Sequence, residues 1–155
     1  MTSDAFSSSI ANNPLSLDAG EPCPCGLGTT FGECCGRYLD TTEFPPTAEA
    51  CMRSRYTAYV LRNGNHLFKT WHPRTRPDDI ELENIVWTGL EITRTRKGMP
   101  HDTTGQVEFT AHWLVEDGHQ ADLHEVSDFE KRGRRWFYVS GDHHFHNVGG
   151  EGPHA

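Results

Sequence analysis

The spacing of apolar residues divides the chain into a helical part followed by a strand-rich part. Over residues 47–71 the apolar positions recur every three or four residues, which predicts two amphipathic helices. Thr47 is placed to cap the first helix, Gly64 to stop it, and Asn65 to begin the shorter second one. A further helical turn is predicted over residues 78–84.

From Ile85 onward the period of the pattern changes to two residues, as in β-strands. The third of the predicted strands shows a slip of phase near Glu125, which predicts a β-bulge. Helices followed by an antiparallel meander define the fold class as α+β. The strands are predicted within residues 85–90, 107–115, 121–129 and 136–139.

Both ends of the chain differ in composition from the region of predicted helices and strands. Residues 1–20 are rich in Ser, Asn and Asp, residues 142–155 are rich in Gly, His and Asn, and neither segment has a sustained apolar period. Such segments bury too little apolar surface to offset the entropy of ordering them, so both are predicted to be flexible tails. Between them we predict a small metal knuckle at 21–37, a linker at 38–46 and an α+β domain at 47–141.

The charge of the chain narrows the classes of partner. A formal net charge of -8 at pH 7 argues against nucleic acid or anionic lipid as the main partner. No apolar run approaches the roughly 18 residues of a transmembrane helix, and no basic region followed by an apolar stretch marks a secretory signal. We therefore expect a cytoplasmic protein that does not bind membranes and keeps its thiols reduced.

Four of the five cysteines lie close together in a Gly-rich segment, as Cys23-Pro24-Cys25 and, after an eight-residue loop, Cys34-Cys35. Two pairs of thiols joined by such a loop can supply the four ligands of a tetrahedral zinc site. Disulfides are disfavoured in a reducing compartment, whereas an iron–sulfur cluster or redox-active thiols remain open. We predict structural Zn²⁺ at Cys23, Cys25, Cys34 and Cys35, with no open coordination position.

The cysteine segment resembles a known zinc-binding motif. The run from Pro22 to Gly26, followed by Phe31 and the Cys34-Cys35 pair, is similar to the SEC-C motif, best known from the SecA translocase. The loop here carries Leu27 and Thr residues where that motif usually has basic ones. The resemblance therefore implies the metal ligands more than the ribosome and chaperone contacts associated with SecA.

The rest of the chain resembles the YchJ-like (UPF0225) proteins. The resemblance implies an NTF2-like domain, a cone of N-terminal helices packed on a curved antiparallel sheet, preceded by a small zinc knuckle. It implies no particular activity, because the family has none firmly assigned. The matching runs are Met52 to Tyr59, Thr70 to Arg76, Leu123 to Phe129 and Trp136 to Asp142.

An NTF2-like cone implies a pocket between its helices and its sheet. Arg53 and Glu125 are expected to form a structural ion pair there, because an unpaired buried charge is unfavourable. Alternatively, Arg53 holds an anionic ligand while His72 or His124 transfers a proton. The candidate pocket residues are Arg53, Tyr56, His72, Trp87, His112, His124 and Glu125.

Two functions remain open at this point. The first, which the sequence favours, is a non-enzymatic accessory or adaptor protein whose zinc knuckle presents a surface to an unidentified protein partner. The second is a small-molecule-binding protein or a proton-transfer enzyme of the isomerase, dehydratase or hydrolase type. Candidate side chains that converge on an open cavity favour the second function, and side chains that pair and fill it favour the first. The oligomeric state does not follow from the sequence.

Overall fold

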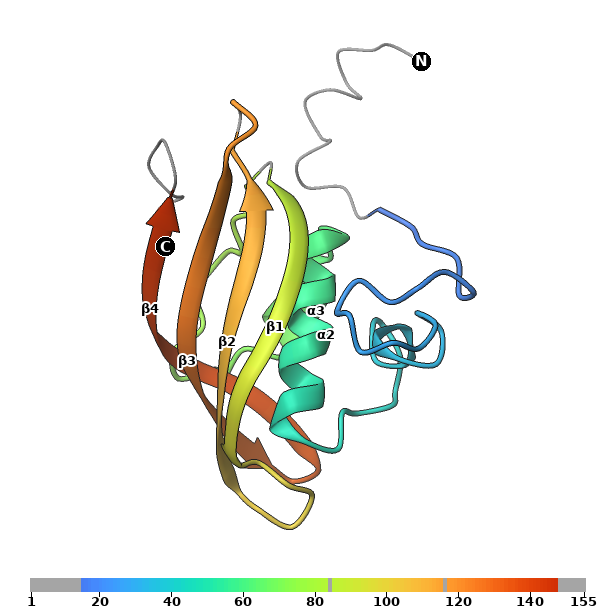
Figure 1. Cartoon of the computed structure of the whole chain (residues 1–155). Helices are drawn as coiled ribbons and strands as arrows, with labels where there is room; N and C mark the ends of the chain where they lie inside the picture. The colour runs from blue at the N-terminus through green and yellow to red at the C-terminus, as the bar shows by residue number, and fades with distance from the viewer. Residues whose placement is uncertain (1–14, 84, 116, 148–155) are drawn as a thin grey trace.

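The computed structural model describes residues 15–83, 85–115 and 117–147 (Figure 1). The four strands form one antiparallel sheet in the order β1-β2-β3-β4. Helix α2 lies against the sheet, and the N-terminal segment lies beside α2 (Figure 1). The elements are the 3-10 helix η1 (Cys35–Arg37), helices α2 (Ala48–Val60) and α3 (Gly64–Lys69), and strands β1 (Val86–Lys97), β2 (Thr104–Leu114), β3 (Gln120–Arg132) and β4 (Arg135–Asn147).

The two helices form in the predicted region with different boundaries between them. The Thr47 side chain caps α2 by accepting a 3.0 Å hydrogen bond from a backbone N–H of the first turn. The chain leaves α2 through Arg62, whose φ of 58° ends the helix before Gly64. Asn63 then caps α3, so Gly64 begins the second helix, one residue before the predicted Asn65.

The predicted helical turn at residues 78–84 does not form over the described residues 78–83. Ile80 and Leu82 are partly buried, whereas Asp79, Glu81 and Glu83 are exposed. This alternation has the period of an extended chain, not of a helix. The segment therefore turns its apolar side chains toward the interior and its carboxylates toward water.

Strand β3 shows why the phase of the sequence pattern slips near Glu125. Its pairing with β2 is continuous from Thr104↔Glu130 to Leu114↔Gln120, so the predicted bulge at Glu125 is wrong. The slip arises because two polar residues, Glu125 and Ser127, occupy the buried face of a regular strand.

The irregularity that involves β3 lies instead in its pairing with β4, and the β1–β2 pairing has two register shifts of its own. Asp128 pairs with Ser140 and Phe129 pairs with Tyr138, which leaves Val139 as an extra residue in β4. Before this bulge Trp136 and Tyr138 face the interior. Beyond it the interior positions are Gly141, His143 and Phe145, opposite Ser127, Glu125 and Leu123.

Residues 142–147 are therefore part of β4, where the sequence predicts the start of a flexible tail. Strict alternation from Trp136 would place Asp142 and His144 inside, and such polar positions do not read as a strand. The one-residue bulge reverses the phase, so both side chains are exposed. Of the predicted tails at 1–20 and 142–155, residues 1–14 and 148–155 lie outside the described residues.

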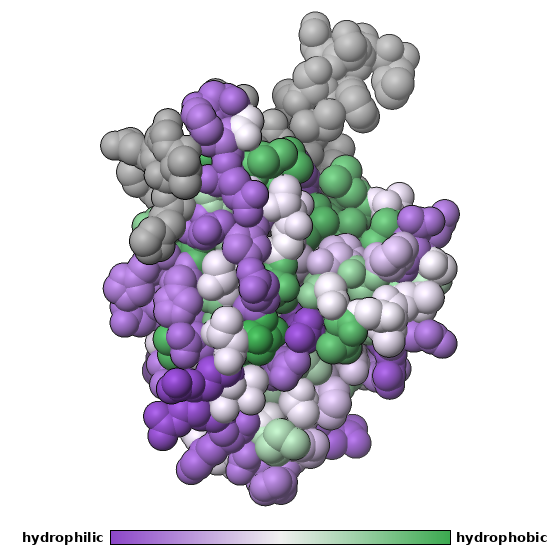
Figure 2. All heavy atoms as spheres, viewed as in Figure 1, coloured by the Kyte–Doolittle hydropathy of each residue, from purple (hydrophilic) through white to green (hydrophobic). Residues whose placement is uncertain are grey.

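The hydrophobic core joins the sheet, α2 and the cysteine segment. It contains Phe109, Phe129 and Trp136 from the sheet, Met52 and Tyr56 from α2, and the four clustered cysteines. The opposite face of the sheet is polar, and Figure 2 shows hydrophilic residues over β3 and β4 at the left of the view. The functional features consequently lie on the α2 side of the sheet.

Candidate metal centre and cavity

The four clustered cysteines form a buried group of thiols. Their Sγ atoms all lie within 4.8 Å of one another. Cys25 and Cys34 have sulfurs 3.6 Å apart, far beyond a disulfide bond. Four thiolates arranged tetrahedrally at ~2.3 Å from a zinc ion would be about 3.8 Å apart, so this donor set fits a single tetrahedral metal ion.

Two tight turns bring the thiols together. Cys23 N–H donates to Thr29 O (3.0 Å), and Gly26, with a φ of 78°, donates to Cys23 O (3.1 Å). At the second pair, Gly36 N–H donates to Phe31 O (2.8 Å). A Cβ at Gly36 would lie 2.7 Å from that oxygen, so glycine is required there by close approach of the backbone.

The contacts between the thiols shift their pKa values in different directions. Hydrogen bonds from Cys25 and Cys35 lower the pKa of the Cys23 thiol. The same contact with Cys23 raises the pKa of Cys25 to about 11, and hydrogen bonding together with burial raises that of Cys35. The shared hydrogen bonds therefore favour a thiolate within this group, which is the form of cysteine that binds a cation.

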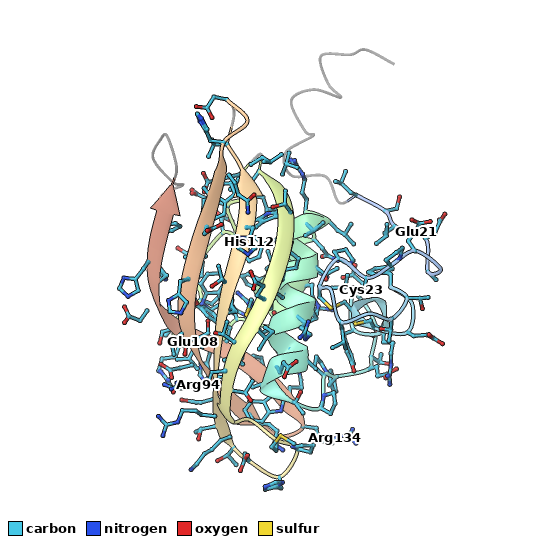
Figure 3. The ribbon with its side chains drawn as sticks, in the orientation of Figure 1. Glu21, Cys23, Arg94, Glu108, His112 and Arg134 are labelled. Atoms are coloured by element: carbon cyan, nitrogen blue, oxygen red, sulfur yellow. The ribbon has the colours of Figure 1, made fainter. Side chains whose placement is uncertain are left out.

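The cysteine segment is attached to helix α2. Arg53 donates from Nη1 to Cys25 O (3.0 Å) and from Nε to Glu49 (2.9 Å). Thr57 lies one turn further along the helix, with its Oγ1 3.9 Å from the sulfur of Cys23. Figure 3 shows Cys23 in the N-terminal segment next to α2. The predicted ion pair between Arg53 and Glu125 is wrong, because Arg53 faces the metal centre.

On its other side, α2 forms a wall of a cavity of about 960 Å³. The remaining walls are the inner face of the sheet, residues 77–83 and Ile85. Most lining side chains are aromatic or aliphatic, and the rings of Tyr56, Tyr59 and Trp113 all pack against Trp87 at 5.6–6.0 Å. Of the candidate pocket residues predicted from the sequence, Tyr56, Trp87 and Glu125 line this cavity.

A buried carboxylate forms the polar part of the cavity wall. Glu125 is 7% exposed, and its Oε2 accepts hydrogen bonds from Ser127 Oγ and from the Tyr138 hydroxyl (3.1 Å). The Nδ1 atom of His143 lies 3.5 Å from its Oε1. A Cβ on Gly141 would lie 2.0 Å from Oε2, so the carboxylate occupies the space that a side chain at position 141 would fill.

The buried arginine of the cavity is Arg55, which the sequence analysis did not select. It is 3% exposed, and its Nη1 donates to Leu67 O (3.0 Å) and Thr70 Oγ1 (2.8 Å). Its guanidinium lies 4.6 Å from the ring centroid of Tyr138 and 5.0 Å from that of Trp71. Burial, with the nearby Glu125 carboxylate, raises the pKa of Tyr138, so its hydroxyl stays a donor.

The other predicted pocket residues lie elsewhere. His72 is buried behind β4, where its backbone N–H donates to Tyr138 O and its Nε2 is 3.3 Å from Glu130. His112 and His124 are on the outer face of the sheet, where they contact acidic side chains, Asp122 and Glu91 for His112 and Glu108 for His124. Figure 3 labels His112 and Glu108 on the strands of the sheet. Arg53, His72, His112 and His124 therefore do not line the cavity.

Fold and cysteine centre together define a class of protein, an NTF2-like domain with an N-terminal cysteine knuckle. The model of the YchJ middle NTF2-like domain matches residues 47–141, and that of the SEC-C motif matches residues 21–37. The chain belongs to the UPF0225 family of YchJ-like proteins. The predicted α+β fold, an NTF2-like cone preceded by a small knuckle, is confirmed.

Relatives of similar length support this assignment. A UPF0225 protein of Streptomyces coelicolor is 45% identical over 122 residues, which is 78% of this chain and 94% of the relative. One from Chromobacterium violaceum is 46% identical over 124 residues, 77% of this chain and 90% of the relative.

Two solved structures have a similar fold. The solution structure of a SEC-C motif containing protein from Rhodopseudomonas palustris matches with a TM-score of 0.71 and 31% identity, over 77% of this chain and 96% of that one. A crystal structure of a SEC-C motif containing protein from Psychrobacter arcticus has a TM-score of 0.65 and 25% identity, over 79% and 82%. Among the described helices of the present chain, none is long and apolar enough to cross a membrane.

Proposed function

We propose that this protein binds a small molecule in the cavity of its NTF2-like domain, and that structural Zn²⁺ fixes the cysteine segment to the helix that walls this cavity. The observation that carries the proposal is the cavity itself. Its volume of about 960 Å³ is in the range of small-molecule sites, roughly 300–1,000 Å³. The side chains around it do not fill it.

The lining indicates what kind of molecule would bind. Aromatic and aliphatic side chains dominate, so apolar burial would supply most of the affinity. The buried charged residues of the lining are Arg55 and Glu125, which balance each other, while the carboxylates of Asp79, Glu81 and Glu83 are exposed at the cavity margin. An uncharged, largely apolar molecule therefore suits the cavity better than an anion.

Zinc is the metal that the cysteine centre suits best. Four thiolates within reach of one ion complete a tetrahedral shell and leave no position for a substrate, which supports a structural role. Metal binding of this kind can contribute on the order of 10 kcal/mol to folding in small peptides. Unbridged thiols are also typical of a reducing compartment, which supports the predicted cytoplasmic location.

The adaptor function predicted from the sequence remains a second candidate. One observation favours it, since Leu27, between the two cysteine pairs, is 53% exposed. An exposed Leu on a segment held rigid by metal could contact a protein partner. In contrast, the hydrogen bond from Arg53 to Cys25 O and the contact of Thr57 with Cys23 connect the segment to α2, which favours a bracing role.

Cavity binding can be tested with a neutral naphthyl ketone dye whose emission shifts to the blue in apolar surroundings. We expect saturable binding of one dye per chain. Replacing Leu123, whose side chain lines the cavity, with Trp should weaken binding about tenfold or more by occupying the site. Val126→Trp, on the opposite face of the same strand, adds an equal ring outside the cavity and should bind dye normally. Equal affinity in both variants would contradict the proposed site.

A further inference from the structure

An acid–base pair lies on the sheet wall of the cavity. His143 comes from β4 and Glu125 from β3, and the two residues are directly paired across the strands. His143 Nδ1 is buried and makes no hydrogen bond within the described part of the chain, although Glu125 Oε1 is only 3.5 Å away. The other carboxylate oxygen is held by Ser127 and Tyr138, which leaves Oε1 as the oxygen beside the imidazole.

We propose that His143 is a catalytic residue that transfers a proton to and from the molecule bound in the cavity, with Glu125 as its positioning residue. This inference rests on the proposed ligand-binding function and assigns a reaction class to the same site. When the 3.5 Å separation closes to hydrogen-bond length, Glu125 accepts from Nδ1–H, and this favours the tautomer whose lone pair is on Nε2. The side chain of His143 is 33% exposed and lines the cavity, so this ring is accessible to a ligand.

The surroundings of the pair favour proton transfer. A carboxylate next to the ring stabilises the imidazolium that forms when Nε2 accepts a proton. The titratable groups that face the pair are Tyr138 on the same strand and Tyr59 and Arg55 on α2, with the exposed acids of residues 79–83 at the cavity margin. The buried Arg55 cation would partly offset negative charge that develops on the ligand.

Isomerisation of an uncharged carbonyl compound is a reaction that needs no catalytic group beyond the pair of His143 and Glu125. Nε2 removes a proton from the carbon next to the carbonyl, and the electron pair of that C–H bond forms the double bond of an enolate. Where the compound is β,γ-unsaturated, this enolate is conjugated with the second carbon–carbon double bond, and the imidazolium returns the proton to the γ-carbon, which leaves the double bond conjugated with the carbonyl group. Atoms and electrons balance within the ligand, and no oxidant, reductant or metal takes part.

The base can be tested without knowing the natural ligand by using nitrobenzisoxazole as the probe. Removal of its C–H proton converts that electron pair into a C≡N bond and breaks the N–O bond, which releases a coloured phenolate. We expect the protein to accelerate this elimination, and His143→Ala to lower the rate about a hundredfold or more. His124→Ala is the matched control, because His124 is on the adjacent strand but on the outer face of the sheet, and its rate should be unchanged.

Glu125→Gln tests the positioning role. We expect the elimination rate to fall about tenfold and the ¹⁵N NMR signals of His143 to show loss of the tautomer protonated at Nδ1. In the parent protein the rate should rise with pH and level off once the imidazole is neutral. Unchanged NMR signals in Glu125→Gln, or a rate that rises without levelling, would overturn the proposal.

Dye binding separates this inference from the function on which it rests. If the His143→Ala variant still binds the naphthyl ketone dye, it is folded and its cavity is intact. A loss of the elimination activity in that variant then supports His143 as the base. If the dye binds but His143→Ala eliminates as fast as the parent protein, the proton-transfer proposal fails and the binding function stands. If the parent protein binds no dye, both fail.

Discussion

Gly141 is a position where the absence of a side chain determines the local structure. The Glu125 carboxylate lies where a Cβ at position 141 would be, 2.0 Å from Oε2. Its backbone φ is not in the left-handed region, so the requirement for glycine comes from space, not from backbone conformation. The glycine therefore allows a buried carboxylate to lie flat against β4 and contact Tyr138.

We expect Gly141→Ala to lower the free energy of unfolding by about 1–3 kcal/mol, because the carboxylate must move away from its donors. Urea denaturation measures this change. Gly89→Ala is the control, since a Cβ on this other strand glycine would meet its nearest neighbour at an ordinary 3.7 Å. Equal stabilities of the two variants would contradict the close approach described for Gly141.

His66 makes a second residue-level prediction, which concerns acid stability. The ring is 2% exposed, and burial lowers its pKa to about 3. An unfolded histidine titrates near ~6.5, so between these values the unfolded state binds a proton that the folded state excludes. Stability is therefore retained above about pH 6.5 and falls as the pH is lowered, by up to ~1.4 kcal/mol per pH unit.

Urea denaturation at pH 7 and pH 5 tests this prediction against His66→Gln. The parent protein should lose about 2 kcal/mol more than the variant over this interval, because the glutamine cannot take up a proton. The comparison cancels the carboxylates and thiols common to both proteins. Equal losses in the two proteins would mean that His66 is not the group responsible.

At the scale of elements, the sequence predicts those features that depend only on residues close together along the chain. The period of three to four residues and the Thr47 cap predicted α2, and the cysteine spacing predicted the metal centre, because both depend on neighbours along the chain. The Val139 bulge could not be predicted, since the extra residue is recognised only when β4 is paired with β3. For this reason the sequence pattern predicts a tail, not a strand, at His143.

The choice of arginine on α2 has a similar explanation. An amphipathic helix with one apolar face would place Arg53 at the edge of the pocket. Helix α2 instead lies between the sheet and the cysteine segment, and it is buried on most of its surface. Arg53 therefore faces the cysteines, while Arg55 is buried among carbonyl and hydroxyl acceptors and aromatic rings that the sequence does not place together.

At the scale of the whole molecule, α2 connects the metal centre to the cavity. Arg53 and Thr57 contact the cysteine segment, and Met52, Arg55 and Tyr56 line the cavity. The linker is also attached to the start of α3, because Asn63 (2.8 Å) and Asn65 (3.0 Å) donate hydrogen bonds to Asp40. A metal ion at the four thiols would thus hold the outer side of the helix whose inner side forms the binding site.

The measurement that tests this account most directly is the zinc content per chain of the purified protein, by elemental analysis with a parallel thiol titration. We expect about one zinc per chain, with the four thiols of the centre becoming reactive when a chelator removes it. The zinc should be lost in Cys34→Ala and retained in Cys51→Ala, because Cys51 is buried outside the centre. The absence of zinc from the parent protein, iron in its place, or zinc retained by Cys34→Ala at full stoichiometry would contradict the account.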